Sequence, residues 1–100
     1  MVSGVPQGLT AKGLRGALQT SGRLAAQLGG WELTYTAEGW RLTAPLVQHD
    51  PHWLESGGPF LLRLNVSGST VWTWRGITEE QVGWDATSIT VTGEGEPEGG

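Results

Sequence analysis

Four side chains that could ligate a metal ion stand between positions 49 and 55: His49, Asp50, His52 and Glu55. Neutral imidazole nitrogens and carboxylate oxygens are ligands that zinc and iron accept in proteins. The spacing matches no known metal-binding motif, Pro51 restricts how the two imidazole rings can converge, and the chain has only 2 histidines. We therefore expect a solvated segment without a metal. A small metal-dependent enzyme built on His49 and His52 is the least favoured function.

Covalent catalysis has no clear residue to carry it. The chain has no cysteine, which excludes a thiolate nucleophile, a disulfide framework and a thiolate metal site. No serine stands in the Gly-x-Ser-x-Gly pattern of hydrolase nucleophiles, and the glycine-rich segments lack the lysine that completes a phosphate-binding loop. The 10 acidic residues show no spacing that marks a catalytic carboxylate pair. We expect no enzymatic activity and no cofactor.

Charge is divided unevenly along the chain. Lys12, Arg15 and Arg23 precede residue 31 with no acidic residue among them, and all 10 acidic residues follow it. This asymmetry suggests a nucleic-acid-binding regulator, with residues 10–28 forming a helix-turn-helix. The glycine placement does not fit that motif, three cations are few, and a net charge of -4 repels phosphate. We therefore keep this function as an alternative and expect no retention on DNA or RNA.

Two tryptophans, Trp53 and Trp84, belong to no strand with alternating apolar residues. Tryptophan is enriched at binding hot spots because it buries a large area and loses little side-chain entropy. Trp53 lies in a long segment, 48–59, without an obvious element, and such loops are functional or wrongly assigned. A partner or a second copy is expected to bind here, with these contact residues: His49, Asp50, His52, Trp53, Leu54, Glu55 and Trp84. Whether Trp53 is an interface anchor or a lid over the core stays open.

The segment 31–44 is typical of a β-hairpin, because its apolar and polar residues alternate on either side of a turn at 36–39. An even-length turn keeps the apolar side chains on one face. It predicts that Tyr35 pairs with Trp40 and that Leu33 pairs with Leu42. Gly39 is then expected to adopt the positive φ that closes the turn.

A second hairpin is predicted for 60–75, followed by a fifth strand at 87–92. A three-residue loop at 66–68 would pair Leu62 with Trp72 and Phe60 with Trp74. The strand tryptophans alternate with polar residues, so we expect them in the core rather than on a base-stacking surface: Trp31, Trp40, Trp72 and Trp74. Between these two elements, Thr78 and Gln81 have the spacing of a capping box and predict one short helical turn.

The segment 10–28 is predicted to be helical, as one helix or two. Thr10 is a plausible N-cap, and apolar or small residues recur at helical spacing: Leu14, Leu18, Ser21, Ala25 and Leu28. Three glycines each weaken such a helix by about 1 kcal/mol relative to alanine. The helix would therefore depend on packing against the sheet.

Together these elements predict a single α+β domain at 1–92, with a helical segment (10–28) packed on an antiparallel sheet of about five strands within the β-rich region 31–92. A small, partly open β-barrel with an N-terminal helix is the alternative. Residues 1–8 are expected to form a flexible arm, and residues 93–100 a flexible acidic tail.

The sequence contains no signal peptide pattern and no apolar run of about 18 residues that could span a membrane. We therefore expect a protein of the cytoplasm or the interior of a virion. The leading functional interpretation is a non-enzymatic interaction or assembly protein, for example a small accessory or structural subunit of a phage particle or multiprotein complex. Its partner would be a protein or a second copy of the chain.

Overall fold

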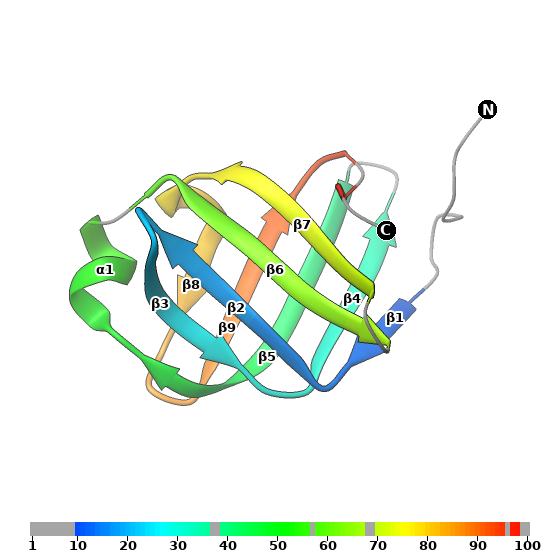
Figure 1. Cartoon of the computed structure of the whole chain (residues 1–100), viewed down its shortest axis with the longest axis horizontal. Coiled ribbons are helices and arrows are strands. Elements are labelled where there is room, and N and C mark those ends of the chain that lie inside the picture. The colour runs from blue at the N-terminus through cyan, green and yellow to red at the C-terminus, as the bar shows by residue number, and fades with distance from the viewer. Residues whose placement is uncertain (1–9, 37–38, 57, 68–69, 96, 99–100) are drawn as a thin grey trace.

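The computed structural model describes residues 10–36, 39–56, 58–67, 70–95 and 97–98. In this part, the chain forms nine strands, one α-helix and one 3-10 turn (Figure 1): β1 (Thr10–Gly13), β2 (Arg15–Thr20), β3 (Arg23–Leu28), β4 (Trp31–Thr36), β5 (Gly39–His49), α1 (Pro51–Ser56), β6 (Phe60–Ser67), β7 (Thr70–Ile77), η1 (Glu79–Gln81), β8 (Val82–Trp84) and β9 (Ser88–Gly93). All strand pairs are antiparallel, and the sheet runs β1-β4-β5-β3-β2-β6-β7, with β9 pairing both β5 and β8.

The sheet is bent into two layers. Strands β1, β4, β5, β9 and β8 form the first layer, and strands β3, β2, β6 and β7 form the second. The chain passes from one layer to the other at Leu14 and at Gly29-Gly30, while β5 pairs with β9 before Leu46 and with β3 from Leu46 onward. Strands of the second layer cross in front of those of the first in Figure 1, as expected where bent strands form corners between packed sheets.

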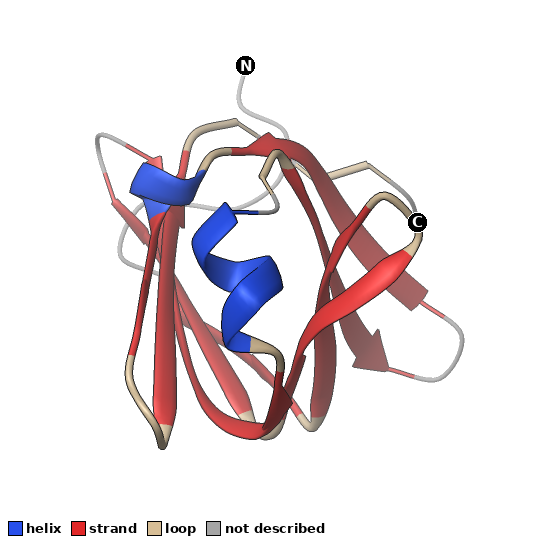
Figure 2. Cartoon of the chain, turned by 90° about the vertical axis from the view of Figure 1, so that its left-hand side faces the viewer, coloured by secondary structure: helices blue, strands red, loops and turns tan. Residues whose placement is uncertain are grey.

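The core fills the space between the layers. Trp31 (1% exposed), Trp40 (3%) and Trp74 (5%) are buried there, while Trp72 is half-buried. The indole rings of Trp40 and Trp74 lie 4.7 Å apart, and Trp31 joins the cluster through Trp72 at 6.5 Å. Three of the four strand tryptophans are therefore core residues, as predicted. Helix α1 covers one open end of the bent sheet (Figure 2).

The first hairpin has the predicted register. Tyr35 pairs with Trp40 and Leu33 with Leu42, and Gly39 has φ +152°. Positions 37–38 of the predicted turn lie outside the described residues. In β9, Ile89 and Val91 are buried, as the alternating pattern indicates.

The second hairpin has a different register from the predicted one. Leu62 pairs with Trp74 and Leu64 with Trp72, a shift of two residues, and Phe60 pairs with Ile77. The shift begins at the turn: Ser67 pairs with Thr70, so β6 extends into the segment predicted as the loop, and an irregularity follows between Asn65 and Ser67. A second irregularity, between Phe60 and Leu62, displaces the pairing of Phe60 further. Because side chains alternate with period two, the shift leaves the inward and outward faces unchanged.

The prediction of a helix at 10–28 is wrong, and with it the α+β fold class. The alternative barrel with an N-terminal helix fails at the same segment, which forms β1, β2 and β3. Ser21 (φ 49°) and Gly22 (φ 77°) both have positive φ, which is the backbone of a two-residue hairpin turn. Leu14, placed on the inner face of the predicted helix, is instead 84% exposed.

Two further segments differ from expectation. The predicted loop 48–59 contains the end of β5 and helix α1, and the predicted tail begins inside β9. Glu98 of this tail pairs with Thr73 of β7 through two backbone hydrogen bonds of 2.9 and 2.8 Å. Residues 1–8, predicted to be an arm, lie outside the described residues. In the part of the chain that the structure describes, no helix is long and apolar enough to cross a membrane.

Candidate functional site

Helix α1 holds most of the predicted contact residues, and its local structure explains where they point. The Asp50 carboxylate accepts a hydrogen bond from the backbone N–H of His52 at 3.1 Å, so Asp50 caps the start of the helix. Leu54 is 2% exposed and belongs to the core. The side chain of Leu54 is therefore not available to a partner, because α1 anchors itself to the sheet through this residue.

Of the remaining predicted contacts, Glu55 is exposed on α1, and the others form two aromatic groups. On α1, the half-buried Trp53 lies between His52, at a ring distance of 5.0 Å, and the guanidinium of Arg23, at 5.1 Å. His49 and Trp84, in β5 and β8, form a separate pair with ring centroids 5.5 Å apart. Among the described residues, no group of three or more potential ligands lies close enough to hold a metal ion.

Of the three basic N-terminal residues proposed for nucleic-acid binding, Lys12 and Arg15 line one cleft, while Arg23 lies against Trp53 of α1. Lys12 lies in β1 and forms an ion pair with Glu32 of β4 at 3.5 Å. Arg23 stacks on Trp53, and Arg15 opens β2. The basic helix that this alternative requires is absent from residues 10–28, because this segment forms strands.

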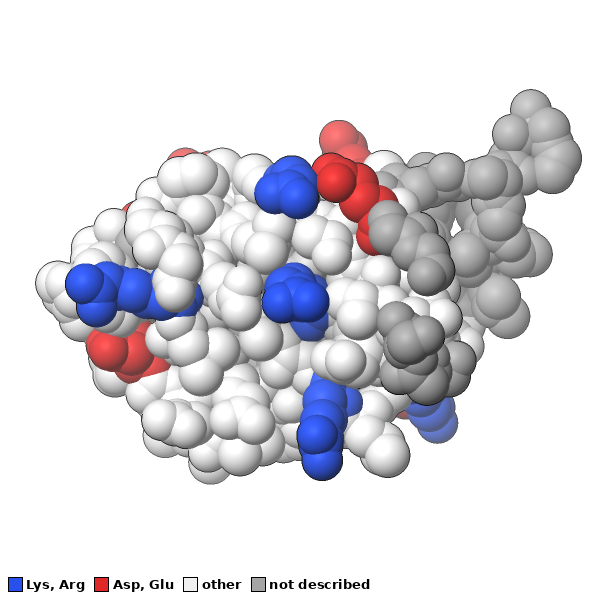
Figure 3. Space-filling model, in the orientation of Figure 1, with Lys and Arg blue, Asp and Glu red and all other residues white. Residues whose placement is uncertain are grey.

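A different positive surface is present on the outside of the second layer. The four strands β2, β3, β6 and β7 contain four arginines and no aspartate or glutamate: Arg15, Arg23, Arg63 and Arg75. Figure 3 shows this side of the molecule, with basic side chains spaced over a largely uncharged surface and acidic side chains towards its margin.

The strand register brings three of these arginines onto adjacent strands. Arg15 lies opposite Asn65, and Arg63 lies between Ala17 and Thr73 of the flanking strands. These side chains point outward because the alternate positions are buried. We call this surface the arginine face and define it by nine outward residues: Arg15, Ala17, Gln19, Leu61, Arg63, Asn65, Val71, Thr73 and Arg75.

A cleft of about 770 Å³ adjoins the arginine face where β1 bends into β2. Its lining includes Lys12, Leu14, Arg15, Trp31, Asn65 and Val66. The indole N–H of Trp31 donates to the backbone carbonyl of Arg15 at 2.8 Å, which ties the two layers together at this point. In this cleft, the exposed apolar side chain of Leu14 lies beside the cationic side chains of Lys12 and Arg15.

Chemically, the arginine face is suited to bind anions. Guanidinium groups present several N–H donors to a carboxylate or phosphate at once. No cofactor or nucleophile is needed for such binding. A signal in the sequence could have indicated this surface, because no acidic residue occurs between Glu55 and Glu79. It was missed because the pairing of β2 with β6 joins segments far apart in the chain.

One carboxyl group shows a perturbed pKa, and its role is local. Hydrogen bonds from the backbone N–H groups of Thr87 (2.8 Å) and Ser88 (3.0 Å), reinforced by the Thr87 hydroxyl, lower the pKa of Asp85. These bonds form the turn between β8 and β9. Asp85 therefore stabilises a turn of the first layer and lies outside the arginine face.

Comparisons with protein-family models, curated proteins and solved structures find no match to this chain. The functional interpretation therefore starts from the surface chemistry. The arginine face combines exposed cations, amide side chains and apolar residues without an acidic residue on its three strands.

Proposed function

We propose that this protein is a non-enzymatic interaction protein that binds an acidic surface of a partner protein through its arginine face, as an accessory or structural subunit of a larger assembly. The observation that carries this proposal is that the strands of the second layer carry exposed arginines and no acidic residue. Arg15, Arg63 and Arg75 lie outward on β2, β6 and β7, and these strands contain no acidic residue.

The composition of the arginine face favours a protein partner over a nucleic acid. Recognition of single strands uses aromatic side chains on which bases stack. Among the described residues of β2, β6 and β7, the outward positions are not aromatic, while Trp74 is buried and Trp72 half-buried. Arginine is enriched at protein interfaces relative to the rest of the surface, and the apolar side chains of Leu61 and Val71 lie outward beside the arginines.

The test uses the even division of the chain's 6 cations. One triple variant removes the cations of the arginine face: Arg15→Gln, Arg63→Gln and Arg75→Gln. The control removes the other three and has the same net charge: Lys12→Gln, Arg23→Gln and Arg41→Gln. The probe is poly-L-glutamate, with binding measured by fluorescence anisotropy over a range of salt concentrations.

We expect the arginine-face variant to bind at least about tenfold more weakly than the control, since each exposed ion pair contributes up to about 1 kcal/mol. An equal loss in both variants would show that net charge alone governs binding, against the proposal. Duplex and single-stranded DNA are tested in parallel. Tighter, salt-dependent binding to DNA would favour a nucleic-acid partner instead. In the same assay, Trp53→Ala tests the predicted contact at α1.

A further inference from the structure

Strand β7 forms one end of the strand order β1-β4-β5-β3-β2-β6-β7. Its backbone groups at Trp72 and Trp74 face β6, with which they pair through Leu64 and Leu62. Because backbone groups alternate in direction along a strand, those of Val71, Thr73 and Arg75 point away from the sheet. β7 therefore presents an edge to which another strand can be added.

The chain itself demonstrates this addition. Glu98 donates its backbone N–H to the Thr73 carbonyl at 2.8 Å and accepts from the Thr73 N–H at 2.9 Å. At the next outward position, the Arg75 guanidinium contacts the Glu98 carboxylate at 3.2 Å. In this antiparallel pair, position 97 faces away from β7, so the missing N–H of Pro97 costs no hydrogen bond to the edge.

The side chains along the edge favour an acidic strand. Arg75 lies on β7 itself, and Arg63 lies opposite Thr73 on the same outward face. A glutamate added opposite Thr73 has a cation diagonal to it, which is the arrangement found for Glu98. A lysine at that position would instead meet like charges.

Among the described residues, the chain's own segment contacts β7 through the pairing of Glu98 with Thr73, the ion pair of Glu98 with Arg75, and a hydrogen bond of 3.4 Å from the Trp74 indole N–H to the Gly95 carbonyl. Among the described residues, it forms a single bridge with β7, at Thr73. The ion pair between Arg75 and Glu98 is solvent-exposed, with 68% and 61% of the two side chains accessible, so water and salt screen it. A longer strand that also pairs at Val71 and Arg75 would form more hydrogen bonds and replace it.

We propose that the outer edge of β7 binds an extended acidic segment of the partner protein, which adds as a strand in place of the chain's own Glu98. This inference rests on the proposed function, because it specifies how the acidic partner engages the arginine face. Backbone hydrogen bonds give the added strand its register, and Arg63 and Arg75 select its charge.

The experiment uses the full chain and a fluorescent eight-residue peptide of alternating glutamate and valine. A matched peptide with alternating N-methyl groups keeps the charge but lacks the N–H donors along one edge. Glu98→Pro removes the N–H that the chain's own segment donates to Thr73. Thr73→Pro, made in the Glu98→Pro background, removes the donor of the edge and leaves the bonds to β6 in place. Binding is measured by anisotropy and by backbone amide shifts.

We expect Glu98→Pro to tighten peptide binding by about three- to tenfold, because the chain's own segment then no longer occupies the edge of β7. Thr73→Pro and N-methylation should each weaken it by about three- to tenfold, the effect of losing one hydrogen bond or more. The amide shifts should centre on Val71, Thr73 and Arg75. If Thr73→Pro fails to fold, these shifts and the N-methyl peptide decide the question.

Equal binding of the two peptides, or shifts confined to other strands, would overturn the edge proposal. In that case, retained binding of poly-L-glutamate to the arginine face would leave the proposed function intact. Loss of both peptide and poly-L-glutamate binding would overturn both proposals. The peptide and poly-L-glutamate measurements together therefore distinguish failure of the edge proposal from failure of the proposed function.

Discussion

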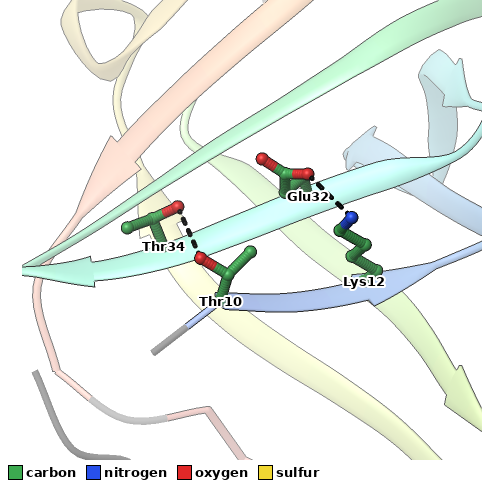
Figure 4. A network of polar contacts seen from close by, with 4 residues as sticks. All are labelled: Thr10, Lys12, Glu32 and Thr34. Atoms are coloured by element: carbon green, nitrogen blue, oxygen red, sulfur yellow. Dashed lines mark hydrogen bonds and ion pairs between the residues drawn. The ribbon is translucent and has the colours of Figure 1, made fainter. Parts of the chain in front are cut away.

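The two layers present outer faces with different chemistry on the same kind of strand. The outside of the first layer is rich in threonine, and we call this surface the threonine face: Thr10, Thr34, Thr43, Thr90 and Thr92. Its charged residues are the ion pair between Lys12 and Glu32 and the exposed Arg41, which lies between Thr34 and Thr92, and the Thr10 and Thr34 hydroxyls lie 3.5 Å apart (Figure 4). The arginine face has three outward cations on strands without acidic residues.

The two faces differ in whether their outward residues favour strand formation or add charge. Threonine is a β-branched residue with high strand propensity, and it covers a sheet without adding charge. Arginine adds a long, charged side chain that a strand does not need for its own stability. Both faces satisfy the same alternation of inward and outward positions. The proposed partner is therefore assigned to the arginine face and not to the threonine face.

The largest expected effect tests whether the two layers share one core and unfold cooperatively. Trp31 is 1% exposed in the first layer, and its indole N–H donates to a carbonyl of the second. We expect Trp31→Ala to reduce the free energy of unfolding by about 3–5 kcal/mol, the usual cost of deleting a buried large aromatic side chain. Urea denaturation followed by circular dichroism measures this cost.

The control for this variant is Thr43→Ala on the threonine face, which should change the free energy of unfolding by about 0.5 kcal/mol or less. Hydrogen exchange adds a second readout. Amides of both layers should lose protection together in Trp31→Ala. Loss in one layer only would mean that the two faces belong to independently folding units.

A smaller effect is expected from alanine substitutions at two glycines, one close to a neighbouring strand and one with open space around it. A Cβ at Gly16 would lie 2.9 Å from Leu64 Cδ2 and 3.1 Å from the Arg63 carbonyl, whereas one at Gly83 would meet nothing within 4 Å. We expect Gly16→Ala to destabilise the protein by about 1–3 kcal/mol through overpacking. Gly83→Ala, in the first layer, should be neutral or slightly stabilising. Equal melting temperatures for the two variants would contradict the close approach of β2 to β6.

The pH dependence of stability should distinguish the turn of the first layer from the arginine face. Hydrogen bonds to the Asp85 carboxylate lower its pKa in the folded protein, so ionisation stabilises the fold above the ordinary pKa of aspartate. This contribution is lost as the pH falls through the lowered pKa. Asp85→Asn should melt at a lower temperature than the parent near neutral pH, and the difference should disappear in acid. A difference that persists in acid would mean that the charge is irrelevant to the turn.

The smallest effect is expected at the ion pair of the threonine face. Lys12 and Glu32 are 74% and 50% exposed, so replacing either should cost about 0–1 kcal/mol and less at high salt. A double-mutant cycle with Lys12→Gln and Glu32→Gln measures the coupling. A coupling well above that range would mean that the ion pair of the threonine face contributes to the stability of the fold.

Local patterns predicted several elements well. The first hairpin has its predicted register because an even turn and strict alternation leave one solution that keeps Tyr35 and Trp40 on the same face. The capping-box spacing of Thr78 and Gln81 marks the short 3-10 turn, where the Gln81 side chain accepts from the Thr78 N–H at 2.9 Å. The predicted register of the second hairpin was wrong because β6 continues to Ser67, within the predicted loop, and because a bulge lies between Asn65 and Ser67.

The sequence by itself determined which side of most strands faces inward, since period-two alternation is a local property of the chain. It did not determine that 10–28 forms strands, because Leu18, Ala25 and Leu28 fit one face of a helix as well as a hairpin around Ser21. Only the tertiary structure decides between the two, because β2 pairs with β6. In this pairing, a Cβ at position 16 would lie 2.9 Å from Leu64 Cδ2, so glycine fits there best. The same non-local pairing brought Arg15, Arg63 and Arg75 together, and no pattern within one segment encodes a surface assembled from three strands.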